Sequence, residues 1–249
     1  MMLALTACAG KMTTAVPRPS PIATGALPEV SASAPVWVTV ANGTVLRIDP
    51  ATNAVAATLQ VGGFPKGVAV SPEAVWVTGC EDNPDLTGKV LRIDAATNQV
   101  RAVTAVGRNP TEIAVGAEGI WVINNYDATL SQIDPVTSQV IATVLVGADP
   151  RALAVGEGSV WVAHSNGSVQ RIDPATHQTV VTLTVGINPN GIAVGDGAVW
   201  VTSYYGHTVS RIDPLTNQVA ATIRAGDYPV GVAVGEGAIW VTRVNSSCN

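Results

Sequence analysis

Short stretches of alternating hydrophobic and polar residues recur along most of the chain, and Gly, Pro, Asn and Asp separate them. Val, Ile and Thr at every second position indicate β-strands, because successive side chains of a strand point to opposite faces. Four such segments follow one another at 190–194, 198–202, 208–213 and 217–224. We expect four strands joined by tight turns there, and no helix.

These segments repeat with a period near forty residues that tryptophan marks. The six tryptophans stand at positions 37, 76, 121, 161, 200 and 240. Each lies in a V-W-V or I-W-V phrase, followed in most copies by R-I-D-P-x-T-N-Q-V or a close variant, V-x-T-x-x-V-G-x-x-P and G-[VI]-A-V. Four strands in about forty residues are typical of a propeller blade. The predicted fold is therefore all-β, a β-propeller of about five to six four-stranded antiparallel blades over residues 35–249.

The repeat is incomplete at its ends. Three strands are expected from Val36 to Gln60, with a weak additional strand near 30–34, whereas the last copy stops after Val241-Thr242. Two interpretations stay open: the terminal pieces combine to close the ring, or the chain is a fragment of a longer propeller with an exposed edge.

The phrases V-W-V-T, R-I-D-P-x-T-N-Q-V and V-G-x-x-P-x-G-V-A-V resemble those of bacterial YVTN-type propeller repeats over about residues 36–243. More distantly, they are similar to virginiamycin B (streptogramin) lyase propellers. The resemblance implies the fold more than the function, because these residues build blades. It also implies that a lyase would use His and Glu around a magnesium ion, and only His164 stands at a matching position. A metal-dependent lyase or hydrolase is therefore kept as the alternative function, and we expect no cofactor.

Several repeated residues have a structural interpretation. One tryptophan per blade is expected to fill the space between neighbouring sheets. The Asp of each Asp-Pro or Asp-Ala turn should accept backbone N–H bonds. The Arg two residues before it, as in Arg92 and Arg171, suggests an ion pair between blades, and Asn42-Gly43 and Asn166-Gly167 suggest two-residue type I′ hairpins.

Binding residues are expected where the repeat is violated, because packing explains the positions that all blades share. In antiparallel blades, the loop leading into the first strand (the lead-in loop) and the loop between the second and third strands lie on one face. Tyrosines and two histidines gather in these loops, and the residue after the lead-in Pro should surround the mouth of the channel. The predicted ligand-binding residues are Lys66, Glu112, Asn124, Tyr126, Arg151, His164, Asn190, Tyr204, Tyr205, His207 and Tyr228. The alternative is that the aromatic residues are hydrophobic pegs for the loops.

The N-terminal region has a different composition. Leu5-Thr6-Ala7-Cys8 resembles a bacterial lipobox, so residues 1–8 are interpreted as a truncated signal with lipidation at Cys8. Residues 9–34 are rich in Ala, Pro, Ser and Thr, as in a semi-extended tether. The two remaining cysteines, Cys80 and Cys248, are an even pair whose bonding the sequence leaves open.

Composition and charge limit the classes of partner that the chain can bind. Charged residues make up 12% and the net charge is −5, so we expect no nucleic acid partner. No apolar run reaches the roughly 18–20 residues of a membrane span. We therefore expect the protein to contact the membrane only through a lipid anchor at Cys8. The predicted function is an extracytoplasmic, monomeric binding or scaffolding module for a small molecule, a glycan or a protein. A purely structural cell-surface repeat is a third possibility.

Overall fold

The computed structural model describes residues 34–116 and 118–244. The interpretations that concern Cys8, the tether and the pairing of Cys80 with Cys248 lie outside these residues. Within them the structure has 21 strands and no helix, as the alternating pattern predicted. This described part accordingly holds no helix that could cross a membrane.

The strands form six antiparallel sheets, which we number one to six in chain order. Sheet one contains β1 (Val36–Val40), β2 (Thr44–Asp49) and β3 (Ala54–Gln60). Sheet two contains β4 (Phe64–Val70), β5 (Ala74–Cys80), β6 (Gly88–Asp94) and β7 (Val100–Val106). Sheet three contains β8 (Pro110–Gly116), β9 (Gly119–Asn124), β10 (Thr129–Ile133) and β11 (Val140–Leu145). Sheet four contains β12 (Pro150–Gly156), β13 (Ser159–His164), β14 (Ser168–Ile172) and β15 (Thr179–Thr184). Sheet five contains β16 (Pro189–Gly195), β17 (Ala198–Ser203), β18 (Thr208–Asp213) and β19 (Gln218–Arg224), and sheet six contains β20 (Pro229–Gly235) and β21 (Ala238–Arg243).

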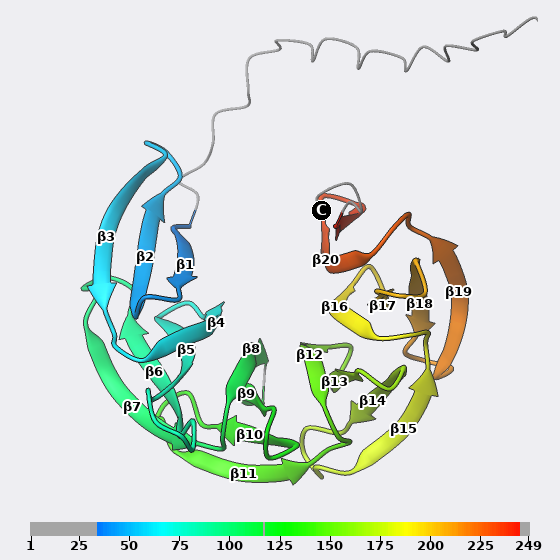
Figure 1. Cartoon of the computed structure of the whole chain (residues 1–249), viewed down its shortest axis with the longest axis horizontal. Coiled ribbons are helices and arrows are strands. Elements are labelled where there is room, and N and C mark those ends of the chain that lie inside the picture. Colours follow the sequence, from blue (N-terminus) through cyan, green and yellow to red (C-terminus); the bar gives the residue numbers. More distant parts are fainter. Residues whose placement is uncertain (1–33, 117, 245–249) are drawn as a thin grey trace, which may run out of the picture. The chain divides into compact units, whose positions relative to one another are not determined.

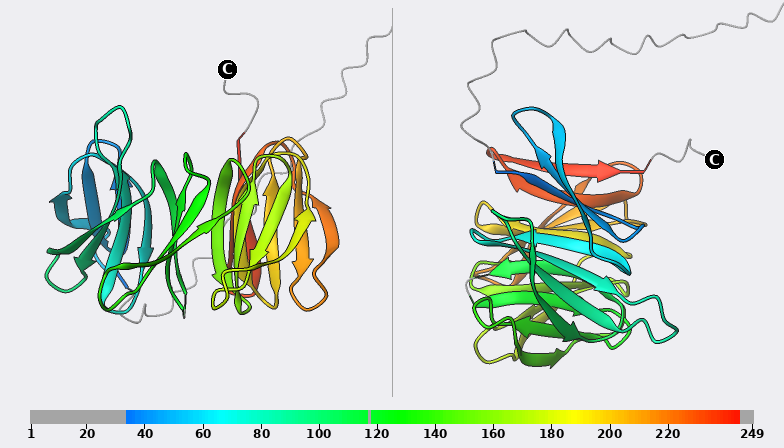
Figure 2. Two further views of the ribbon diagram at one scale, coloured as in Figure 1. Left: turned by 90° about the horizontal axis from the view of Figure 1, so that it is seen from below. Right: turned by 90° about the vertical axis from the view of Figure 1, so that its left-hand side faces the viewer.

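The six sheets follow one another along a propeller-like arc (Figure 1). The first strands of successive sheets, β4, β8, β12, β16 and β20, contact one another along its inside. The fourth strands, from β3 to β19, form the outside, and the connecting loops gather at the two ends of the strands (Figure 2). Each residue at the start of a first strand is thereby brought towards the middle of the arc.

The two terminal sheets stay separate in the structure. Sheet one has three strands and sheet six has two, and each contains its own tryptophan strand, β1 with Trp37 and β21 with Trp240. The same strand position is therefore occupied in both pieces, so they do not complete one another as a single four-stranded sheet.

The tryptophans of sheets two to four form the core between neighbouring sheets. Trp76, Trp121 and Trp161 are at most 1% exposed, and each lies in an apolar cluster that spans its own sheet and the next. Trp161, for example, packs with Ile192 of β16, the first strand of the following sheet. Trp240 of sheet six is 64% exposed, because no further sheet covers it among the described residues.

The repeated arginines connect neighbouring sheets, but not as ion pairs. The guanidinium of Arg171 lies 5.1 Å from the ring centroid of Trp161 in the same sheet, and Arg92 stacks on Trp76 at 5.6 Å. Arg171 then donates to the carbonyl of Pro214 at 2.6 Å, in the turn of the next sheet, and Arg92 to the carbonyl of Val136 at 3.3 Å. Within the described residues neither has a carboxylate partner, because the facing turn presents carbonyl oxygens.

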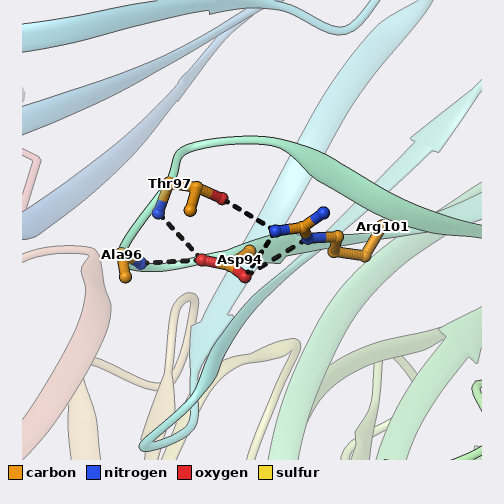
Figure 3. A network of polar contacts seen from close by, with 4 residues as sticks. All are labelled: Asp94, Ala96, Thr97 and Arg101. Carbon is orange, nitrogen blue, oxygen red and sulfur yellow. Dashed lines mark hydrogen bonds and ion pairs between the residues drawn. The ribbon is translucent and has the colours of Figure 1, made fainter.

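The repeated Asp residues stabilise the turns between the third and fourth strands, as predicted. Asp94 accepts hydrogen bonds from the backbone N–H groups of Ala96 at 3.0 Å and Thr97 at 2.8 Å, and Arg101 lies 3.1 Å from its other oxygen (Figure 3). These contacts, the Thr97 N–H first, lower the pKa of Asp94 from 3.8 to about 2. The pKa values of the corresponding carboxyls are also lowered, those of Asp134, Asp173 and Asp213.

These turns predict acid-sensitive stability. Because the folded pKa lies below the unfolded value of about 4, the carboxylates stabilise the fold above that pH and lose this contribution as pH falls towards about 2. Asp94→Asn keeps an oxygen acceptor without the titrating proton. Chemical unfolding at a series of pH values should therefore show a shallower loss of stability between pH 4 and 2 in this variant. An unchanged slope would contradict the role of Asp94.

The Asn-Gly hairpins differ from the prediction. Gly43 donates to the carbonyl of Val40 at 3.2 Å and Gly167 to that of His164 at 3.1 Å, so each connection has three residues. Only the glycines have positive φ, 84° and 96°, whereas a type I′ turn needs it at both central residues. The Asn instead uses its side chain: the Asn166 oxygen accepts from the Ser168 N–H at 3.1 Å.

Candidate functional site

The lead-in loops and the loops between second and third strands lie on one face and are hydrogen-bonded to each other. The backbone N–H of Asn125 donates to the carbonyl of Asn109 at 3.1 Å, and that of Tyr204 donates to Asn188 at 3.0 Å. The backbone N–H of Ser165 likewise donates to the carbonyl of Asp149 at 3.2 Å. We call this end of the strands the loop face.

A cavity of about 650 Å³ opens on the loop face at the inner ends of sheets three to six. Its lining combines amides, carboxylates, one guanidinium and one tyrosine. The lining residues are Asn109, Thr111, Glu112, Asn125, Tyr126, Asp149, Pro150, Arg151, Asn190 and Val230. Four of the predicted binding residues, Glu112, Tyr126, Arg151 and Asn190, thus lie around one space.

Hydrogen bonds fix much of this lining. Asn125 donates to the Pro150 carbonyl at 2.8 Å, which joins the loop of sheet three to the start of β12. Arg151 forms an ion pair with Asp149 at 3.0 Å. Lys66, another predicted residue, does not line the cavity but donates its amine to the side-chain oxygen of Asn109.

Glu112 differs electrostatically from its neighbours in the cavity. Its side chain is exposed to solvent at the mouth of the cavity, while the neighbouring atoms of the walls still desolvate the carboxyl in part. This desolvation raises the pKa of Glu112, and no neighbouring cation lowers it. The described residues contain no ion pair to this carboxylate.

Elsewhere a glycine and a threonine seal the boundary between first strands. In sheet two, the Gly67 N–H donates to the Thr78 hydroxyl oxygen at 2.8 Å, and the same hydroxyl lies 3.2 Å from the carbonyl of Thr111 in sheet three. A Cβ at Gly67 would lie 2.6 Å from that carbonyl, so only glycine fits. Gly191 and Thr202 of sheet five repeat the arrangement, with 2.8 Å from Thr202 to the carbonyl of Val230. We call this arrangement the Gly–Thr link.

The Gly–Thr link is missing in sheets three and four, which contribute most of the cavity lining, whereas the linked carbonyls of Thr111 and Val230 border the cavity on its two sides. In sheet three Glu112 and Ile123 stand at these two positions, and in sheet four Ala152 and Ala163 do. Neither Ile nor Ala has a hydroxyl to hold the carbonyl of the next first strand. Both members of the pair change together, so the cavity coincides with a coupled departure from the repeat.

Two predicted binding residues lie beneath the loop face. Asn124 is fully buried and donates to the hydroxyls of Thr129 at 3.0 Å and Ser131 at 2.9 Å. His164 is 1% exposed, with Nδ1 3.3 Å from the Ala148 carbonyl, and burial lowers its pKa. Neither lines the cavity around Glu112. Asn124 lines a separate hollow of about 420 Å³ beside β10, and His164 supports the lead-in loop above it.

The remaining predicted residues form an aromatic cluster on the loops of sheets five and six. Ring centroids are separated by 4.9 Å for Tyr204–Tyr205, 5.1 Å for Tyr204–Tyr228 and 5.0 Å for His207–Tyr228. The backbone N–H of Tyr228 donates to Nδ1 of His207 at 3.2 Å. None of the four lines the cavity. Their mutual packing is what loop pegs would show, which was the alternative interpretation of these aromatic residues.

The described residues contain no group of three or more His, Cys, Asp or Glu side chains placed to hold a metal ion. His164, the residue that matched the lyase resemblance, is buried. Another hollow, of about 360 Å³, lies at the opposite end of the strands, between sheets two and three against Trp76 and Arg92. It follows from the repeated sheet interface rather than from any departure from it.

Comparison with known proteins adds no assignment, since no family model and no curated protein matches the chain.

Proposed function

We propose that the chain is a β-propeller of the YVTN-repeat kind that binds a small polar ligand, such as a short glycan, in the cavity on its loop face. The observation that carries the proposal is the cavity of about 650 Å³, whose lining departs from the repeat. Positions that serve only packing are the same from sheet to sheet, as the tryptophans are. Polar groups that converge on one concave site, and that packing does not require, usually mark a binding site.

The chemistry of the lining favours binding over catalysis. Asn190 can donate and accept hydrogen bonds, and the amide nitrogen of Asn109 can donate, whereas Asn125 is already bonded to the Pro150 carbonyl. Tyr126, 59% exposed, offers an aromatic face. A metal-dependent lyase or hydrolase requires converging ligands, which the described residues lack. The binding module is therefore the better-supported function. Its export and lipid attachment at Cys8 rest on the lipobox-like Leu5-Thr6-Ala7-Cys8.

A screen of the full chain against glycans and polar metabolites tests this function, with Tyr126→Ala as the diagnostic variant. Its affinity for a ligand from the screen should fall about 5- to 30-fold, as for an aromatic anchor worth about 1–2 kcal/mol. Tyr205→Ala is a matched control, because Tyr205 is 58% exposed in the corresponding loop of sheet five and lies outside the cavity.

Three outcomes would contradict the cavity as the binding site. One is equal loss of affinity in the Tyr126 and Tyr205 variants, which would point to the aromatic cluster. Another is a ligand whose affinity neither variant changes. The third is a screen in which no glycan or metabolite binds, which would favour a scaffolding role.

A further inference from the structure

Glu112 occupies a position at which the repeat uses glycine. The corresponding residues are Gly67, Gly191 and Gly231, with Ala152 in sheet four. A Cβ on Gly67 or Gly191 would lie 2.6 or 2.5 Å from the carbonyl of the next first strand. A carboxylate side chain at this position is therefore incompatible with the close approach seen at the other boundaries. Local departures of this kind from a self-consistent repeat are expected at functional sites.

The charge of Glu112 is not compensated within the cavity. The guanidinium of Arg151 is paired with Asp149 at 3.0 Å, and on the loops above, Arg108 is paired with Asp127 at 2.7 Å. The amine of Lys66 donates to the side-chain oxygen of Asn109, and Lys66 itself lies outside the lining. The cavity lining therefore contains one cation and two carboxylates, and the unpaired carboxylate is Glu112.

The groups around Glu112 suit a positively charged ligand. A carboxylate in the lining that lacks a cation partner can attract a cationic group of the ligand, which adds to both affinity and selectivity. The face of Tyr126 can contribute a cation–π contact. The amides of Asn109 and Asn190 can bind hydroxyl groups beside the charge.

We propose that the cavity selects ligands that carry an ammonium group, with Glu112 as the counter-ion. This inference rests on the proposed function, and it names the chemical class of the ligand. A hydroxylated amine fits the lining, with the ammonium at Glu112 and the hydroxyls at the asparagine amides.

Three six-carbon polyols that differ only at C1 test the inference: glucamine carries an ammonium, sorbitol a hydroxyl and gluconate a carboxylate. Their binding to the full chain is measured by calorimetry or by protein-observed NMR at neutral pH. Glucamine should bind at least about tenfold more tightly than sorbitol, because its ammonium pairs with the carboxylate of Glu112. Gluconate should bind most weakly, because the two carboxylates repel each other.

Variants at Glu112 identify the counter-ion. Glu112→Gln keeps size and hydrogen bonding, so it should reduce the affinity for glucamine to that for sorbitol, while Glu112→Asp should keep part of the preference. Glu118→Gln is the control, since Glu118 is an exposed carboxylate just before β9, at the opposite end of the strands, and should leave the preference unchanged. Thermal unfolding of each variant checks that the fold is intact.

Two results would overturn the inference. Equal affinity for glucamine and sorbitol, unaltered by Glu112→Gln, would leave the cavity as a binding site without charge selectivity. If glucamine does not bind at concentrations up to about 10 mM, its dissociation constant lies above the millimolar range, and the ammonium class is rejected. The proposed function fails separately, if the Tyr126 and Tyr205 comparison gives no difference for any ligand of the screen.

Discussion

Trp161→Ala is expected to lower the free energy of unfolding by about 3–5 kcal/mol, the usual cost of truncating a fully buried tryptophan. Trp161 is completely buried between sheets four and five, where it packs with Ile192 and Val199. Removing the indole leaves a cavity that these aliphatic residues cannot fill, and it also removes the surface on which Arg171 stacks. Denaturant unfolding followed by far-UV circular dichroism measures the loss.

Trp240→Ala provides the matched control in another copy of the repeat, sheet six. Trp240 occupies the same strand position but is 64% exposed, so its replacement should change stability by less than about 1 kcal/mol. A loss as large as that of Trp161→Ala would show that Trp240 is covered in solution, by another part of the chain or by a second molecule.

Gly191→Ala is expected to destabilise the fold by about 1–3 kcal/mol, the range for overpacking a tight contact. The added methyl would lie 2.5 Å from the carbonyl of Val230 and 3.1 Å from the Thr202 hydroxyl. Backbone cannot withdraw as a flexible side chain can, so sheets five and six must separate at their inner strands. Thermal unfolding and denaturant titration should both report the loss.

Two further variants separate this clash from a general effect of alanine. Gly235 ends β20, and no atom lies within 4 Å of the place that an added methyl would take, so Gly235→Ala should be near neutral. The double change Gly191→Ala with Thr202→Ala recreates the pair Ala152–Ala163 of sheet four. It should cost less than the sum of its single changes, because residues in contact are not additive. Strict additivity would contradict the Gly–Thr link.

Much of the fold could be predicted from the sequence because blades repeat and their side chains alternate. In sheet five the predicted segment 208–213 coincides with β18, and 198–202 falls one residue short of the end of β17. The Asp turns were also predictable, since the mechanism is local. The arginine contacts were not, because their acceptors are backbone oxygens of the next sheet, which a sequence does not mark.

The site was predictable only in part. Antiparallel geometry placed Glu112, Tyr126, Arg151 and Asn190 on one face, and the cavity brings them together. The sequence does not indicate how deeply a loop-face side chain is buried. The prediction therefore grouped His164, which is buried, with exposed residues. The joint replacement of Gly and Thr in sheets three and four was visible in the sequence. It became meaningful only once the structure showed that the two residues touch.

The Gly–Thr link also bears on how a repeat protein can acquire a new activity. The link involves two residues on adjacent strands and leaves the tryptophan core and the Asp turns untouched, as sheets three and four show. Because the sheets repeat the same strand arrangement, two substitutions could open a pocket at any boundary that carries the link, while the remaining boundaries keep the protein folded. Duplicated blades would thus supply spare boundaries for divergence, and ligand specificity could evolve at one boundary with little cost to the others.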